Sequence, residues 1–208
     1  MKNLTTKIGS GATQRGGREV YINQGIALIR SQNVYDSEFV WSGLARISSE
    51  ATNQVNTIEV LREDVLLNIT GASILRTFFF DPEVVPARVN QHVTIIRAKP
   101  DIPSRFLHLY LLLPNTKEYL LGLNAGASRE AIVTKGHIEL TPIIEPTRKL
   151  LTKFQDIIKT VYSSTEQLGW QTRSLTALRD TLPPRRLSGQ MCTSGHHFKK
   201  ADTKVSRP

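Results

Sequence analysis

The chain has 208 residues, of which 39% are hydrophobic and 22% charged, so its composition excludes disorder throughout and allows a buried core. Its one cysteine, Cys192, excludes an intrachain disulfide framework and a cysteine-based metal site. No apolar run reaches the roughly 18 residues that a membrane helix needs, and the N-terminus lacks the apolar stretch of a signal peptide. We therefore expect a soluble, cytoplasmic protein without a membrane partner.

The positive charge is concentrated in the last third of the chain. Residues 1–145 carry 15 Lys and Arg against 14 Asp and Glu, whereas residues 146–208 carry 12 against 4. Ten of the 15 cations in the first part are arginines, whose forked guanidinium suits phosphate and guanine. Ordinary surface arginine is the alternative explanation, because a basic sequence alone is weak evidence for nucleic-acid binding.

The first 145 residues carry the pattern of a compact mixed domain. Short apolar runs predict strands at residues 20–22, 26–29, 65–69 and 91–97. Residues 103–113 are typical of a helix, and residues 116–123 of a second helix after the break at Pro114. Residues 1–145 are therefore predicted to form a compact mixed β-sheet domain.

Residues 146–182 change to a heptad pattern, because apolar residues recur at steps of 3 and 4 with no proline between Pro146 and Pro183. We name these residues the helical seam: Leu150, Phe154, Ile157, Val161, Leu168, Leu175, Leu178 and Leu182. A period of 3.5 favours one long coiled-coil-forming helix over an amphipathic helix packed on its own domain. So narrow a stripe needs a second helix, which implies a partner chain or a second copy. The whole chain is thus predicted to have an α+β fold that ends in this helix.

Motifs for catalysis and for nucleotide or metal binding are missing from the sequence. The N-terminal glycines lack the ending of a P-loop, and no Ser, His and Asp set has recognisable nucleophile spacing. His92, His108 and His137 are scattered and are read as structural histidines. His196 and His197 lie in a polar basic tail, residues 191–208, which we expect to be disordered rather than metal-binding. The chain is predicted to bind rather than to catalyse, with no metal and no cofactor of its own.

The order of several segments resembles a known family. These segments are KIGSGATQRGGREVY (residues 7–21), GIALIRSQNV (25–34), EDVLLNITG (63–71), ARVNQHVTIIR (87–97), RFLHLYL (105–111), GASREAIVTKGHI (126–138) and QTRSLTALRDTLPPRRLSGQM (171–191). Together they are similar to the specificity subunit of type I restriction-modification systems, in a half-length form with one target recognition domain. The last segment is similar to the family's conserved helical region, which here would cover residues 146–190.

The resemblance implies a DNA-reading protein that has no catalytic activity of its own. In the family, a target recognition domain reads one half of a split double-stranded DNA site. The helices set the gap and hold methyltransferase subunits, which bind S-adenosylmethionine, and restriction subunits join them. Full-length members have two recognition domains and two long helices, so we expect this chain to form a homodimer or to pair with another half-subunit. A homodimer would read an interrupted palindrome.

Candidate DNA contacts are polar and basic residues in loops near the ends of the predicted strands. Arginine can fork onto guanine, and Gln or Asn onto adenine. The candidates are Arg15, Arg18, Arg30, Gln32, Asn33, Asn68, Thr70, Arg76, Arg88, Asn90, Gln91, Ser128, Arg129 and Lys135. Each could instead stabilise a turn or lie on the surface. The alternatives to a working DNA reader are an inactive or assembly-only remnant of such a subunit and a basic RNA-binding protein.

Overall fold

The computed structural model describes residues 1–12, 20–54, 58–80, 86–123 and 132–181. The strands in this part of the chain are β1 (Thr5–Ser10), β2 (Ile26–Ile29), β3 (Val34–Tyr35), β4 (Glu38–Phe39), β5 (Ala45–Ile47), β6 (Ile58–Val60), β7 (Val65–Asn68), β8 (Thr77–Phe79), β9 (Ala87–Val89) and β10 (Val93–Ala98). The α-helices are α1 (Ser49–Gln54), α2 (Ser104–Leu112), α3 (Pro114–Gly122), α4 (Lys135–Leu140) and α5 (Arg148–Thr181), and short 3-10 helices span Lys2–Leu4, Ser31–Asn33 and Gly71–Ser73. The fold is therefore a mixed α+β fold, as expected.

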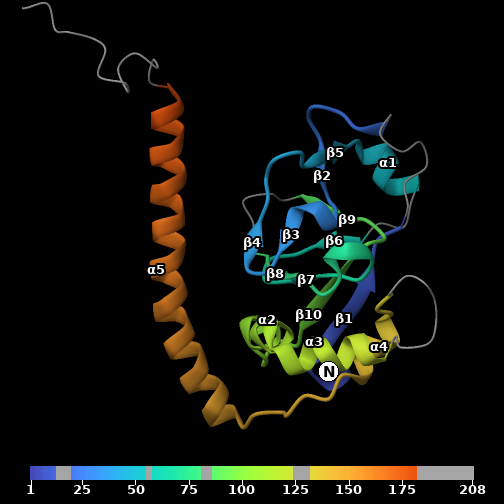
Figure 1. Ribbon diagram of the computed structural model, residues 1–208, viewed down its shortest axis with the longest axis vertical. Coiled ribbons are helices and arrows are strands. Elements are labelled where there is room, and N and C mark those ends of the chain that lie inside the picture. Colours follow the sequence, from blue (N-terminus) through green and yellow to red (C-terminus); the bar gives the residue numbers. More distant parts are fainter. Residues whose placement is uncertain (13–19, 55–57, 81–85, 124–131, 182–208) are drawn as a thin grey trace, which may run out of the picture. The chain divides into compact units, whose positions relative to one another are not determined.

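Most of the strands form two four-stranded sheets (Figure 1). The first sheet has the order β1-β10-β7-β8 and is antiparallel throughout. The second has the order β5-β2-β9-β6, in which β2 and β9 are parallel and the other pairs are antiparallel. Strands β3 and β4 form a separate hairpin.

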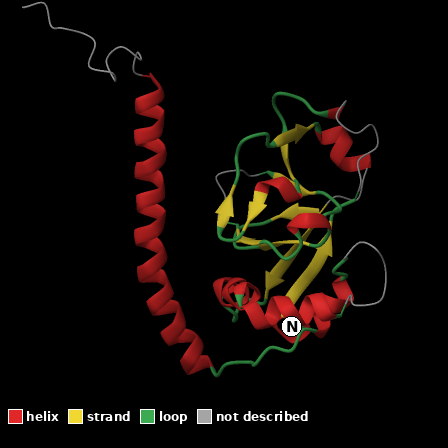
Figure 2. Cartoon of the chain, in the orientation of Figure 1, coloured by secondary structure: helices red, strands yellow, loops and turns green. Residues whose placement is uncertain are grey.

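The first sheet is covered on both faces. One face packs into a core with the helices, through Val65, Leu67 and Ile96, while the other packs toward the second sheet, through Leu66 and Ile95. A strand buried on both sides shows a continuous apolar run rather than alternation. This explains why β7 and β10 were predicted correctly from their composition. The same holds for β2 of the second sheet, whose Leu28 and Ile29 lie in different apolar clusters. Helices α2 and α3, near α4, lie at one end of the domain (Figure 2).

Two details near the predicted elements differ from expectation. Residues 20–22 do not form a strand: Ile22 N donates to Arg46 O at 3.0 Å, and no ladder extends from this bond. Pro114 does separate two helices, but it is the first residue of α3 rather than a residue of the linker. Proline suits that position because the first N–H groups of a helix have no partner within it.

An ion pair between a buried carboxylate and a half-buried arginine joins the two sheets. Asp64, just before β7, is fully buried and accepts from Arg97 Nε and Nη2 on β10, both at 2.8 Å. Arg97 Nη2 also donates to Glu59 O on β6, and Leu61 N donates to Asp64 Oδ2 at 2.8 Å. The hydrogen bonds that Arg97 donates to Asp64 raise the pKa of Arg97. The pair thus fixes the second sheet against the first.

The first turns of α5 belong to the domain. The chain divides into a unit of residues 1–158 and a second unit that begins at Lys159. Within the first unit, Leu151 is 7% exposed in the helix-covered core, and the Phe154 ring lies 5.8 Å from Phe106 in an edge-to-face contact. The preceding segment is held as well, since Ile143 packs on this core and the Tyr110 hydroxyl donates to the carbonyl of Pro142.

Candidate nucleic-acid interface

Loops that follow several strands meet at one edge of the domain. Because β2 and β9 are parallel neighbours, Arg30 and Asn90 leave them side by side, and Asn90 N donates to Ile29 O at 3.1 Å. The amide of Asn68, at the end of β7, donates to Ser31 O at 2.9 Å. The structure therefore brings together three predicted segments that are far apart in the sequence: residues 30–33, 68–76 and 88–91. We name these three segments the loop edge.

The chain after β1 also reaches the loop edge. Gly11 N donates to Asn90 O at 3.1 Å, and a Cβ atom at Gly11 would lie 1.7 Å from Val89 O. Glycine at this position is therefore a steric requirement. Four of the predicted contacts, Arg15, Arg18, Ser128 and Arg129, lie outside the described residues.

A polar chain runs across the loop edge through His92. Thr70 Oγ1 lies 2.6 Å from His92 Nδ1, and Gln91 Nε2 lies 2.9 Å from His92 Nε2. All three side chains are partly exposed. Both nitrogens of His92 are thus engaged, and the histidine fixes the directions in which the Thr70 hydroxyl and the Gln91 amide point.

The two asparagines Asn33 and Asn68 are fully buried and act within the protein. Asn33 Oδ1 accepts from Arg30 N at 3.1 Å, and its Nδ2 donates to Val40 O at 2.8 Å. Asn68 Nδ2 donates to Ser31 O and also to Val34 O, the latter at 3.2 Å. These amides hold the loops in place and are not presented to a base, contrary to what their position at strand ends led us to expect.

The arginines of the loop edge differ in how far their N–H groups are already used. Arg30 Nη2 donates to Gly43 O at 2.6 Å, and its guanidinium lies 5.2 Å from the Tyr21 ring. Arg88 Nη1 lies 3.3 Å from Glu59 Oε1, so it pairs within the second sheet. Both arginines are partly buried. They shape the loops at least as much as they supply positive charge.

Other predicted contacts are presented to solvent. Gln32 is exposed, and Thr70, Arg76, Asn90 and Gln91 are half-buried. The main chain of Val133 donates to Ile69 O at 2.9 Å, which brings the segment before α4 close to the loop edge. On that helix, Lys135 is exposed and lies 3.5 Å from Glu139. These side chains can donate to phosphates and to base edges.

Within the described ranges, no three His, Cys, Asp or Glu side chains are grouped as metal ligands. Over the same ranges, no helix is long and apolar enough to cross a membrane. His108 is buried and His137 supports the start of α4, where its main-chain N donates to Thr134 Oγ1 at 3.3 Å. What the loop edge offers is hydrogen-bond donors and acceptors.

The helical seam is the second candidate surface. Helix α5 has 34 residues, and five residues of the seam, Leu150, Ile157, Val161, Leu175 and Leu178, are between 54% and 66% exposed. Phe154 differs from the others because it is half-buried against Phe106. The placement of the Leu168 side chain and of Leu182 lies outside what the structure describes. An apolar stripe of this kind is stabilised when a second helix covers it.

Comparison with known proteins gives one clear sequence relative. No protein-family model matches the chain. The specificity subunit of the type I restriction enzyme HindI from Haemophilus influenzae is 26% identical over 106 residues, which cover 51% of this chain and 23% of that protein. Over those residues the chain is similar in sequence to a type I specificity subunit. It spans about a quarter of the matched protein's length.

A solved chain from a study of complex assembly and conformational transition of the type I R-M system has a TM-score of 0.44 and 14% identity to this chain. The similarity covers 83% of this chain and 40% of that one.

Three residues in or near the loop edge were not predicted from the sequence as part of the site. His92 was read as structural, whereas it joins two of the candidate contacts. The other two are Tyr35 and Trp41, each 37% exposed, which no motif in the sequence points to. The pattern that could have indicated these two residues is an aromatic residue in a short alternating run next to a turn. This pattern is typical of a hairpin with one set of side chains facing outward.

Proposed function

We propose that this chain reads one half of a bipartite double-stranded DNA site, as the sequence-reading part of a type I restriction-modification complex. The observation that carries the proposal is the loop edge, where segments with basic and amide side chains gather around rigid strand ends. Sequence similarity to a type I specificity subunit supports the proposal. Residues 1–145 would be the recognition domain and residues 146–190 the helical region.

Phosphate and base contacts would have separate roles. Residues 1–145 carry a net charge of only +1, so bulk attraction is weak and cations must be focused near the DNA. Arg30 and Lys135 suit phosphate contacts, together with Arg15, Arg18 and Arg129. Gln32 and Gln91 suit adenine, whose edge matches an amide.

The helical seam would join this chain to a second helix, either in a second copy or in another half-subunit. Two copies joined antiparallel would place identical recognition domains at opposite ends and would read an interrupted palindrome. Light scattering should give a mass near twice 23.3 kDa. Ile157→Asp and Leu175→Asp should give monomers, because a charge in the paired stripe would lose its water. Thr152→Asp, on the opposite face of α5, is the matched control and should remain paired.

Catalysis would belong to other subunits. We propose that the paired helices dock methyltransferase subunits, which supply S-adenosylmethionine chemistry, and that restriction subunits join that complex. An added methyltransferase subunit of a type I system should therefore co-elute with the wild-type chain.

Selection from duplexes with a randomised central segment tests the proposed function. Repeated capture by the full chain, with and without the methyltransferase subunit, should enrich one sequence. Enrichment of no sequence by a chain that still pairs and still holds the methyltransferase would contradict DNA reading and would favour an assembly-only remnant.

A further inference from the structure

The hairpin β3–β4 is fixed tightly on the first sheet next to the loop edge. Ser37 N donates to Thr77 O at 3.0 Å, and Thr77 N donates to Asp36 Oδ1 at 3.0 Å. The other oxygen of Asp36 pairs with Lys117 Nζ on α3 at 2.6 Å. Figure 1 shows the hairpin beside β8. The turn of the hairpin therefore has a set position relative to the residues that lead into β8.

Arg76 lies against this hairpin. Its guanidinium carbon is 4.3 Å from the centre of the Tyr35 ring, close enough for a cation–π contact. Tyr35 is 37% exposed and Arg76 is half-buried, so the stacked pair lies at the surface. A stacked guanidinium keeps its N–H groups in the plane of the fork, where they can point outward.

The backbone before Arg76 is fixed as well. Leu75 has a φ of +63°, a backbone conformation that is strained for any residue other than glycine. Its side chain is nevertheless packed in the core and is only 2% exposed. Leu75 N donates to Asn68 O at 2.8 Å, and Asn68 N donates to Arg76 O at 2.9 Å. Core packing and these two bonds together hold the strained residue, which sets the direction in which Arg76 leaves the loop.

Arg76 differs from the neighbouring arginines in having its donors available. Arg30 uses Nη2 on a carbonyl, Arg88 pairs with Glu59, and Arg97 forks onto Asp64. Among the described residues, Arg76 has the Tyr35 ring as its side-chain contact and no carboxylate partner. A guanidinium that is held in one orientation and has no carboxylate partner can donate two N–H groups to two acceptors that lie in one plane.

We propose that Arg76 is a specificity-determining residue that selects guanine, and that Tyr35 is its positioning residue. The inference rests on the proposed function, because it names the base that one side chain of the loop edge would read. Guanine presents O6 and N7 as two acceptors in the major groove, which match two N–H groups of one guanidinium. Lysine carries the same charge but cannot make this forked contact. The competing role is a phosphate contact, which would carry no base preference.

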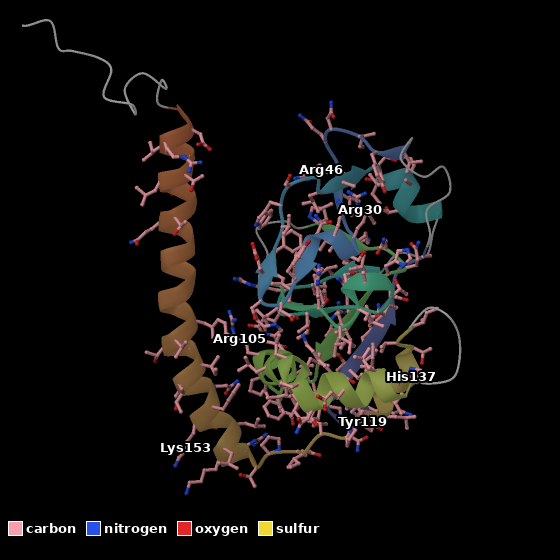
Figure 3. The ribbon with its side chains drawn as sticks, in the orientation of Figure 1. Arg30, Arg46, Arg105, Tyr119, His137 and Lys153 are labelled. Carbon is pink, nitrogen blue, oxygen red and sulfur yellow. The ribbon has the colours of Figure 1, made fainter. Side chains whose placement is uncertain are left out.

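The test measures binding of the full chain to the duplex enriched from the randomised pool, and to duplexes changed at one base pair at a time. Arg76→Lys should lower discrimination at one G·C pair by about 5- to 150-fold and leave the other positions unchanged. Tyr35→Leu should lower discrimination at that same pair, whereas Tyr35→Phe should keep it because the ring remains. Arg105→Lys is the matched control, since Arg105 also stacks on an aromatic ring, 4.0 Å from Phe79, but lies on α2 (Figure 3).

Three results would overturn the inference. Equal weakening at every sequence by Arg76→Gln, with a smaller salt dependence of binding and no loss of base preference, would identify a phosphate contact instead. Unchanged discrimination in Arg76→Lys would overturn the role of Arg76 while leaving the proposed function intact. A wild-type chain without any sequence preference would overturn the proposed function and this inference with it. Circular dichroism of each variant verifies folding, and Arg76→Gln provides a second variant if Arg76→Lys does not fold.

Discussion

Replacing His108 by leucine should make the stability of the domain less dependent on pH. His108 lies on α2 and is 1% exposed, with its ring 6.4 Å from Phe79 and Nε2 at 3.4 Å from Thr77 O. Burial lowers the pKa of His108 to about 4. The bond to Thr77 works against this shift, the charges of Arg105 and Lys117 add to it, and that of Asp36 opposes it.

The direction and size of the effect follow from proton linkage. The histidine binds a proton near pH 6.5 in the unfolded chain and near pH 4 in the folded one. As the pH falls, His108 is protonated first in the unfolded chain, which stabilises the unfolded state. The contribution of neutral His108 to the free energy of unfolding is therefore full above pH 6.5 and is lost progressively toward pH 4. Between about pH 7 and about pH 5 the loss amounts to about 2 kcal/mol, as an order of magnitude.

Urea unfolding at these two pH values measures the effect in wild type and in His108→Leu. Carboxylates titrate in both proteins, so the difference between their pH dependences isolates the histidine. The free energy of unfolding of wild type should fall by about 2 kcal/mol more than that of the variant when the pH is lowered. His137→Asn, on α4, controls for the removal of a histidine. Identical pH dependence in wild type and His108→Leu would refute the reasoning.

Two further substitutions test the fold around the loop edge. Asp64→Asn should lower the free energy of unfolding by about 2–4 kcal/mol, because it leaves Arg97 without its charged partner; denaturant titration measures this, and a loss below about 1 kcal/mol would contradict the role of the pair. Gly11→Ala should destabilise the domain by more than about 2 kcal/mol, because the new Cβ would meet Val89 O, and thermal unfolding measures this. A Gly11→Ala variant as stable as wild type would mean that β1 and β9 do not approach as closely as described.

The elements that could be predicted are those whose whole length is buried or periodic. β2 and β7 have only apolar side chains, apart from the final Asn68, because each is covered on both faces. By contrast, β3, β4, β5, β8 and β9 have two or three residues each, too few for an alternation to be recognised. Residues 20–22 have a strand-like composition, but Ile22 makes a single main-chain hydrogen bond, to Arg46 O, and no ladder forms. Local propensity is too weak to form a strand without one.

The candidate site could be predicted as a set of loops but not residue by residue. Strand ends with Arg, Asn and Gln indicated the loop edge, since loops carry binding residues on a rigid sheet. The sequence does not reveal toward which side an asparagine points, and the amides of Asn33 and Asn68 turn inward to bond with main-chain groups. The Tyr35–Arg76 contact joins residues on different elements, so it depends on tertiary packing that no local pattern contains.

Footprinting on the duplex enriched by selection tests the central claim, that paired copies of this chain read two halves of a DNA site. The wild-type chain with its methyltransferase subunit should protect two equal segments, related by inversion and separated by a gap of fixed length. A single contiguous protected segment would contradict the account.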